Sequence, residues 1–122
     1  MKATFRIDYP TSKDKQKYWT KNYGLNAYYA GKPFYKRNED SKFWHTLTYY
    51  AVKGMAPFCE PVRLVFYWND GLDLSNHAAM AKMIEDGLVR AKKLPNDNRT
   101  WVKEIVHRFH YKPYIEVTIE TY

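Results

Sequence analysis

The chain has 122 residues, of which 45 % are hydrophobic and 27 % charged, a balance that suits one domain with one core and excludes wholesale disorder. Its net charge of +7 and its 18 % of aromatic residues favour a nucleic acid over a membrane as partner, because phosphates bind cations and unpaired bases stack on rings. The single cysteine, Cys59, excludes an intrachain disulfide and a zinc site built on several thiolates. With no apolar leader and no membrane-length apolar run, we expect a soluble protein of a reducing cytoplasm.

The first half of the chain is expected to hold one strand and one long helix. Residues 4–9 are expected to form a short strand, which Pro10 ends. Residues 13–37 form a polar, aromatic-rich stretch with seven basic residues and a single acid, to which we assign no helix or strand. A helix is predicted from about residue 38 to 53, where apolar residues recur at helical spacing and Gly54 stops it.

The second half is expected to alternate strands with one further helix. Residues 61–68 have the alternation of a strand, and Ser75 or Asn76 can cap a helix that runs to about residue 93. A strand at about 101–110 and a last strand around 115–119 are close enough in sequence to form a hairpin. The predicted fold is a single α+β domain, residues 1–122, with two main helices packed on a four-stranded mixed sheet.

Three aspartates are candidates for a metal site. Asp73 lies between the strand at 61–68 and the next helix, Asp86 lies on that helix, and Asp97 lies in the turn after it. Mg²⁺ prefers oxygen ligands and usually takes one or two carboxylates with waters and a phosphate. Such an ion would activate water and stabilise the leaving oxygen of a phosphodiester. Lys82, four residues before Asp86, would neutralise a phosphate or simply pair with Asp86.

Spacing alone leaves ordinary roles open for these aspartates. Asp73 would serve equally well as a turn residue, and Asp97 as a loop aspartate between Asn96 and Asn98.

The order of these residues resembles the signature region of the RusA family of Holliday junction resolvases. Asp73-Leu74-Ser75-Asn76 is similar to the acidic loop that opens a helix in that family. Lys82 and Asp86-Gly87-Leu88 are similar to positions on the helix, and Leu94-Pro95-Asn96-Asp97 to the turn after it. Upstream, the segment from Gly24 to Lys32, with Arg37 and Trp44-His45 beyond it, is similar to the N-terminal segment of phage-type members.

The resemblance implies roles for individual residues. Asp73 matches the first catalytic aspartate, Asn76 the motif asparagine that contacts DNA, and Lys82 the functional lysine, which serves catalysis and DNA binding. Asp97 matches the last metal-binding aspartate, and Asp86 an acidic helix position. Asp73, Asp86 and Asp97 would thus bind the metal, and Asp73, Lys82 and Asp97 would be catalytic.

The resemblance also implies an activity and a partner. Members are small homodimers that nick Holliday junctions and related branched DNA at paired phosphodiesters with Mg²⁺ as cofactor. They are crossover junction endodeoxyribonucleases, typically encoded by phages and prophages. A role in recombination and repair follows, in the cytoplasm of a bacterial cell or phage-infected host.

Two departures from the family pattern leave an alternative open. Ser75 and Asn96 stand where many members have aspartates, so metal affinity would fall or a single ion would bind; Asp70 would compensate if its loop folds back. The chief alternative is therefore a non-catalytic branched-DNA-binding protein with a degenerate metal site. A third possibility is an interaction protein whose tyrosines form a protein interface.

Phosphate contacts are expected mainly from the basic stretch at 13–37. The candidates are Lys21, Lys32, Lys36 and Arg37. Its rings would stack on unpaired bases, or pack over the sheet or a dimer interface, and we expect some to do each.

The four histidines are expected to be structural. His107 and His110 are three residues apart on a strand and would point to opposite faces, which makes a poor metal pair. His77 is expected to be exposed at the start of a helix.

Overall fold

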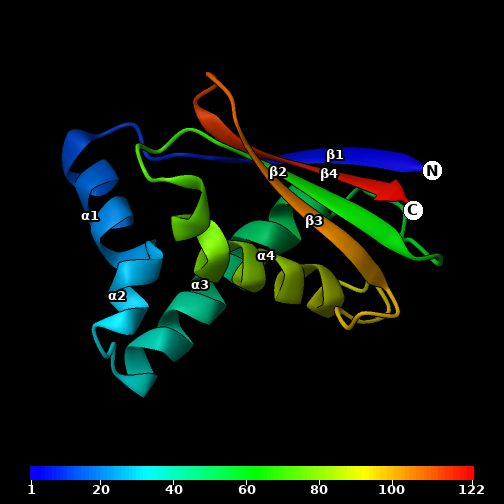
Figure 1. Ribbon diagram of the computed structural model, residues 1–122, viewed down its shortest axis with the longest axis horizontal. Helices are drawn as coiled ribbons and strands as arrows, with labels where there is room; N and C mark the ends of the chain where they lie inside the picture. Colours follow the sequence, from blue (N-terminus) through cyan, green and yellow to red (C-terminus); the bar gives the residue numbers. More distant parts are fainter.

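A mixed sheet forms one layer of the molecule and the helices lie against one of its faces (Figure 1). The computed structural model describes all 122 residues. No helix combines the length and the apolar character needed to cross a membrane. The elements in chain order are β1 (Lys2–Asp8), α1 (Lys13–Tyr23), α2 (Leu25–Tyr29), α3 (Phe34–Val52), β2 (Val62–Trp68), the 3₁₀ helix η1 (Leu74–His77), α4 (Ala78–Arg90), β3 (Val102–Phe109) and β4 (Tyr114–Thr121).

The sheet confirms the predicted α+β class with four mixed strands, but the predicted hairpin is wrong. The strand order is β1-β4-β2-β3, so the last two strands are not neighbours. β4 is antiparallel to β1 and β2, and β3 is parallel to β2 across the helix α4. Ile115, Val117 and Ile119 of β4 are fully buried, which suits an inner strand with a partner on each side. The polar strand β3, with Lys103 and Glu104 exposed, takes the edge.

The basic stretch contains two helices that the sequence analysis did not assign. Ser12 caps α1, since its hydroxyl accepts a hydrogen bond from the Lys15 amide at 3.2 Å. Only Trp19 and Tyr23, four residues apart, are buried on α1. The buried apolar side of this helix therefore consists of two rings in eleven residues, and the rest of its surface is polar apart from the exposed Tyr18.

The helix predicted after Ser75 begins and ends differently from the prediction. A 3₁₀ turn, η1, precedes α4, which starts at Ala78 and ends at Arg90. The end comes before the predicted residue 93 because Lys92 has a φ of 60°, a left-handed conformation that stops a helix. The Lys93 amide then donates back to the carbonyl of Leu88 at 2.9 Å, which closes the last turn.

The two longest helices, α3 and α4, meet closely at a glycine. A Cβ atom at Gly87 would lie 2.8 Å from Cβ and 3.0 Å from Cγ2 of Thr48, a residue that is fully buried. We expect Gly87→Ala to reduce the free energy of unfolding by about 1–3 kcal/mol, because the helices must separate or Thr48 must rotate. Gly54→Ala, where no atom lies within 4 Å of the new Cβ, is the control in urea unfolding. Equal stability of the two variants would contradict the close contact.

Candidate functional site

Two of the three predicted metal ligands lie together around Lys82. The Lys82 ammonium is 3.2 Å from Oδ1 of Asp86 and 2.5 Å from Oδ2 of Asp97. Asp86 follows Lys82 by one turn of α4, so those two share a helix face. Asp97 reaches them because the turn after α4 folds back along the helix. The side chains of Asn96 and Asn98 stabilise that turn by accepting hydrogen bonds from backbone amides at 2.7 and 3.0 Å.

The two carboxyl groups have opposite electrostatic surroundings. Burial, and then the hydrogen bond with Asp97, raise the pKa of Asp86. Hydrogen bonds with Asp86 and Lys82 lower the pKa of Asp97. Lys82 responds in turn, since its hydrogen bond to Asp97 raises the pKa of the ammonium group. Lys82, Asp86 and Asp97 therefore form one hydrogen-bonded cluster, which we call the Lys82 cluster.

A third acid, Glu85, stands beside the Lys82 cluster and was not among the predicted site residues. It is only 5 % exposed, and burial raises its pKa to about 7. It lines a shallow depression with Lys82 on α4 and with Ile105 and His107 on β3. The sequence spacing could have predicted this burial. Glu85 follows the buried Ala81 by four residues, which places the acid on the buried face of the helix.

The Lys82 cluster opens into a second depression, of about 370 Å³, between α3 and α4. Asn38 and Ser41 of α3 line it together with Asp86, Arg90 and Asp97. The exposed residues Lys36 and Arg37 directly precede Asn38 on α3. The basic start of α3 is therefore next to the acidic pair. Arg90 adds a cation that was not among the predicted site residues.

Asp73 is not part of the Lys82 cluster in this chain. It lies just before η1 with an exposed side chain, and its backbone carbonyl accepts a hydrogen bond from the Asn76 amide at 3.0 Å. No group of three or more histidine, cysteine, aspartate or glutamate side chains is arranged to hold a metal ion. The structure thus joins Asp86 to Asp97 and leaves Asp73 apart from them.

The prediction of an exposed His77 is wrong. The ring is fully buried and stacks on Trp68, with ring centroids 4.1 Å apart. Its Nε2 is 2.7 Å from Oδ1 of Asp70, and its Nδ1 is 3.1 Å from the carbonyl oxygen of Leu74. This contact also decides the role of Asp70, which holds His77 and the amide of Leu72 and makes no hydrogen bond or ion pair with Asp86 or Asp97.

The histidines near the end of the chain have structural contacts, as predicted. Nδ1 of His107 accepts a hydrogen bond from the Trp68 indole at 3.0 Å. Nε2 of His110 lies 2.6 Å from the carbonyl oxygen of Tyr114.

Lys32 is not available to bind DNA, contrary to the prediction. Its side chain is 7 % exposed and forms an ion pair with the equally buried Asp40. The ammonium also donates to the carbonyl of Asn22 at 2.7 Å and lies 4.8 Å from the centre of the Tyr28 ring. Tyr28 donates its hydroxyl proton to Asp40 at 2.7 Å. Lys32 therefore connects the loop before α3 to α3 itself.

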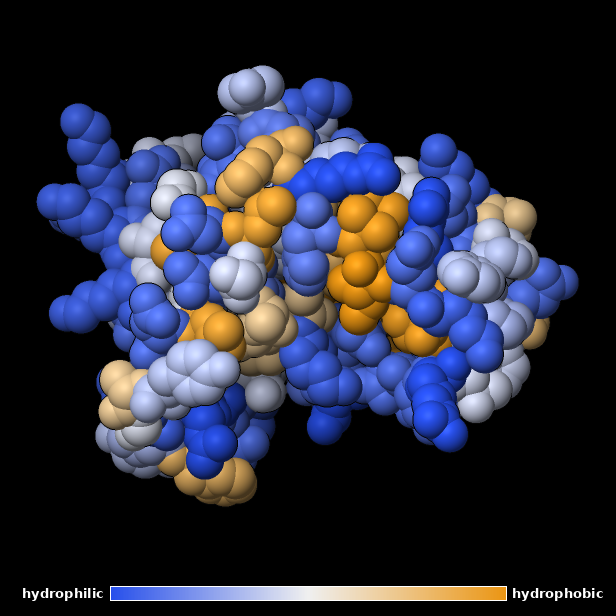
Figure 2. All heavy atoms as spheres, viewed as in Figure 1, coloured by the Kyte–Doolittle hydropathy of each residue, from blue (hydrophilic) through white to orange (hydrophobic).

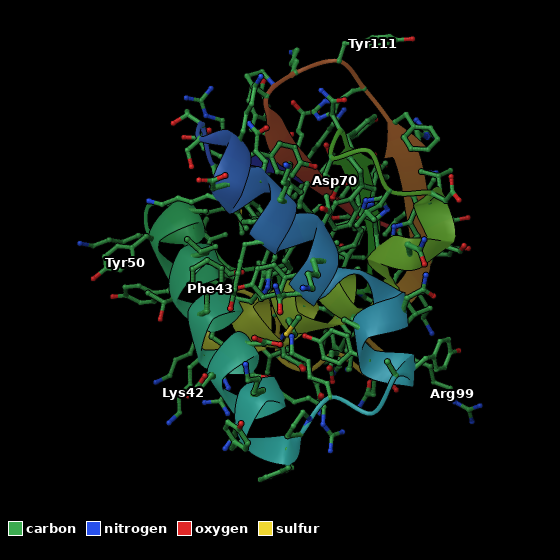
Figure 3. The ribbon with its side chains drawn as sticks, turned by 90° about the vertical axis from the view of Figure 1, so that its left-hand side faces the viewer. Lys42, Phe43, Tyr50, Asp70, Arg99 and Tyr111 are labelled. Atoms are coloured by element: carbon green, nitrogen blue, oxygen red, sulfur yellow. The ribbon has the colours of Figure 1, made fainter.

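The other predicted phosphate contacts are free to reach a ligand. Lys21, Lys36 and Arg37 are exposed. The rings of the basic stretch fall into two groups: Trp19 and Tyr23 join the core, whereas four others are largely exposed, namely Tyr18, Tyr29, Phe34 and Tyr35. Exposed basic and aromatic side chains continue along α3, where Lys42 and Tyr50 project into solvent (Figure 3). Asp70, in contrast, lies inside the molecule, behind α1 in this view.

No protein-family model matches the chain, and no curated protein matches it.

Proposed function

We propose that this chain is a Mg²⁺-dependent, structure-specific DNA endonuclease of the RusA type, a crossover junction endodeoxyribonuclease. It would nick Holliday junctions and related branched DNA at paired phosphodiesters. One observation carries the proposal: Asp86 and Asp97 flank the Lys82 ammonium at 3.2 and 2.5 Å. These residues stand in the order in which the RusA-like motif has them, beside the basic start of α3.

The Lys82 cluster fits Mg²⁺ as a site with two protein carboxylates. Both carboxyl groups contact the same cation, the Lys82 ammonium, so a divalent ion in its place would have a carboxylate on each side. Two carboxylates are also the number that Mg²⁺ commonly takes, with waters and phosphate oxygens completing its shell. When bound there, the ion would supply a Lewis acid beside the scissile phosphate.

Each residue of the site then has a proposed role. Asp86 and Asp97 would hold the cofactor, and Lys82, released from them, would bind a phosphate oxygen. Arg90 and the start of α3 would position the DNA strand through its phosphates, with Lys21 and Arg37 as further exposed cations. Asp73 and Asn76 remain proposed site residues on the grounds of the motif alone.

We further propose that the active form is a homodimer and that the second copy binds β3. Ile105, His107 and Phe109 face the helical layer, because they pair with Leu64, Phe66 and Trp68, which are all fully buried. The helices cover them only in part, and Ile105 and Phe109 stay 40 % and 60 % exposed. Figure 2 shows apolar side chains gathered on the face where β3 crosses α4. A two-fold dimer suits a four-way junction, which must be cut at paired strands.

Phe109→Lys tests this interface by analytical ultracentrifugation at micromolar concentration. We expect the unchanged chain to sediment as a dimer and Phe109→Lys as a monomer, since a buried lysine would lack a partner. Tyr111→Lys is the control, because Tyr111 is 99 % exposed beyond the end of the strand. A monomeric unchanged chain, or a dimer that survives the Phe109 change, would contradict the proposed interface.

The activity is tested with a synthetic four-way junction labelled on each arm. We expect paired nicks close to the branch point in Mg²⁺, no cutting in EDTA, and no cutting of a linear duplex of the same sequence. Binding of the junction without nicking in either Mg²⁺ or Mn²⁺ would overturn the nuclease proposal.

The same assay identifies the second candidate function, a non-catalytic branched-DNA-binding protein with a degenerate metal site. The separation of Asp73 from Asp86 and Asp97, together with the neutral Ser75 and Asn96, favours this candidate. It predicts salt-dependent binding of the junction and no cleavage with any divalent ion.

A further inference from the structure

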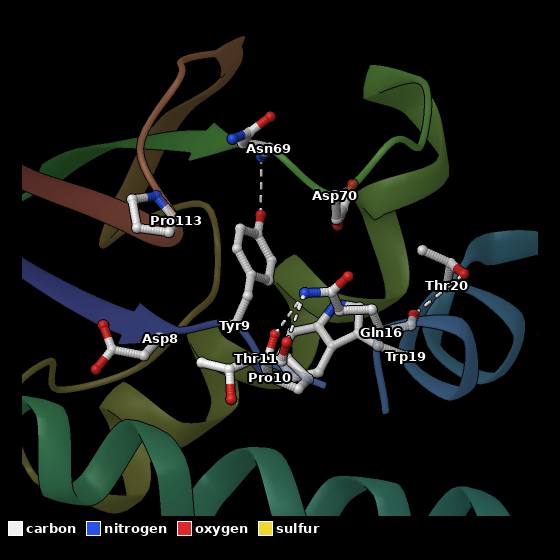
Figure 4. A pocket seen from close by; sticks show the side chains of 10 residues that line it. All are labelled: Asp8, Tyr9, Pro10, Thr11, Gln16, Trp19, Thr20, Asn69, Asp70 and Pro113. Carbon is white, nitrogen blue, oxygen red and sulfur yellow. Dashed lines mark hydrogen bonds between the residues drawn. The ribbon is translucent and has the colours of Figure 1, made fainter. Parts of the chain in front are cut away.

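A cavity of about 600 Å³ lies apart from the Lys82 cluster and shares no residue with it. It is formed where the end of β1, the helix α1 and the loop after β2 meet (Figure 4). Its volume is within the range of about 300–1,000 Å³ that is usual for small-molecule sites. The residues that give it its chemistry are Tyr9, Pro10, Trp19, Asn69, Asp70 and Pro113.

Asp70, one of the residues that line this cavity, has a buried carboxylate oxygen without a hydrogen-bond partner. Its side chain is 3 % exposed. Oδ1 is occupied, since it accepts a hydrogen bond from the Leu72 amide at 3.1 Å and contacts His77 at 2.7 Å. Oδ2 is buried and has no hydrogen-bond partner. Because an unpaired buried carboxylate oxygen is costly, this atom is an acceptor that an N–H or O–H group of a ligand would satisfy.

Two side chains with a free hydrogen-bond donor, Trp19 and Tyr9, line the same cavity as Asp70 (Figure 4). Trp19 is 4 % exposed, and its indole Nε1–H is buried without an acceptor. The Tyr9 hydroxyl oxygen accepts a hydrogen bond from the Asn69 amide at 2.8 Å, and the hydroxyl donates to no atom of the chain. A ligand that satisfies this cavity must therefore offer both a donor, for Asp70, and an acceptor, for Trp19 or Tyr9.

The charge and shape of the cavity narrow the class of ligand. No lysine or arginine lines it, whereas Asp8 and Asp70 do, so a phosphate group is excluded. An alkylammonium group would satisfy Asp70 but would offer no acceptor to Trp19. A flat, neutral heteroaromatic ring fits the donors, the acceptor and the ring faces of Tyr9, Pro10 and Pro113 together.

We propose that this cavity receives one unpaired nucleobase. An N–H group of the base would donate to Oδ2 of Asp70, and its ring nitrogens or carbonyl groups would accept from Nε1 of Trp19 and from the Tyr9 hydroxyl. Proteins that bind extruded bases use this combination of hydrogen bonds to the base edge and apolar stacking. The choice of a base over other heteroaromatic rings rests on the proposed function, since a branch point exposes unpaired bases.

The test is a titration of the ¹⁵N-labelled protein with each of the four nucleosides, without metal and without phosphate. The chain has four tryptophans, and the indole N–H signal that Trp19→Phe removes identifies Trp19. We expect at least one nucleoside to shift this signal saturably and to leave the signals of Trp44 and Trp101 in place. Tyr9→Phe, which keeps the ring and removes only the hydroxyl, should weaken binding about fivefold, as one lost hydrogen bond does.

The proposal is overturned if no nucleoside shifts the Trp19 signal up to its solubility limit. It is also overturned if Tyr9→Phe and Trp19→Phe both bind with unchanged affinity, which for Trp19→Phe is measured on the backbone amide signals of Asn69 and Asp70. Because the titration needs neither Mg²⁺ nor cleavage, it is independent of the nuclease assay. Nucleoside binding without junction nicking would remove the nuclease proposal alone, and nicking without nucleoside binding would remove the base site alone.

Discussion

Replacing Asp97 with asparagine is expected to abolish nicking of a four-way junction while junction binding persists. Asp97 is one of the two carboxylates that would hold Mg²⁺, and its Oδ2 lies 2.5 Å from the Lys82 ammonium. The amide is isosteric but neutral, so the site loses half of its anionic charge. We expect the single-turnover rate at saturating protein to fall by about 100-fold or more, the scale seen when a group that stabilises transition-state charge is removed.

Asp14→Asn is the matched control for this experiment. It makes the same chemical change in the first turn of α1, where Asp14 is exposed and forms no ion pair. Both variants raise the net charge by one, so non-specific attraction to DNA changes equally. We expect Asp14→Asn to nick at close to the original rate. Nicking by Asp97→Asn at that rate as well would remove Asp97 from the chemistry.

Replacing Lys32 with methionine is expected to cost about 3–5 kcal/mol of folding free energy, the scale for breaking a buried ion pair from one side. The change leaves the Asp40 carboxylate buried without its cation. It also removes the donor to the Asn22 carbonyl, which connects α1 to the loop before α3. Urea unfolding followed by tryptophan fluorescence measures the loss.

Lys36→Met separates this structural role from DNA binding. Lys36 is exposed in the first turn of α3 and forms no ion pair. We expect its replacement to leave stability within about 0.5 kcal/mol. It should lower the slope of log affinity against log salt concentration by about 0.9, as the loss of one phosphate contact does. If instead Lys32→Met folds normally and lowers that slope, Lys32 binds phosphate and the structural assignment is wrong.

The strands could be predicted closely from the sequence, but their pairing could not. Residues 61–68 were expected as a strand, and β2 covers Val62–Trp68, because an alternating or continuous apolar run is a local signal. Which strand lies beside which is not local. β4 pairs with β1 and β2 rather than with β3, because its apolar residues are buried most completely at an inner position.

The helices of the basic stretch were missed for a related reason. In α1 only Trp19 and Tyr23 face the core. One pair of apolar residues at helical spacing is too short a pattern to predict a helix. The helix α3, which carries a longer apolar pattern, was expected at 38–53 and runs over Phe34–Val52.

The candidate site was predictable where it depends on one helix and not where it depends on tertiary contacts. The pairing of Lys82 with Asp86 follows from their i,i+4 spacing. The return of Asp97 to Lys82 depends on the conformation of the turn after α4. The burial of His77 against Trp68 depends on how η1 packs on β2. From composition alone, Lys32 and Lys36 were equally good candidates for a phosphate contact. Only the fold shows that Lys32 forms a buried ion pair with Asp40.

A titration with Mn²⁺, followed by electron paramagnetic resonance of the free ion, examines the Lys82 cluster without DNA. We expect one divalent ion to bind between Asp86 and Asp97, in the place that the Lys82 ammonium occupies. Asp86→Asn and Asp97→Asn should each weaken binding about tenfold or more, the scale for disturbing a metal site. Lys82→Met should tighten it, because a competing cation is removed. Mn²⁺ affinity that none of these three changes alters would show that the two carboxylates do not hold the ion.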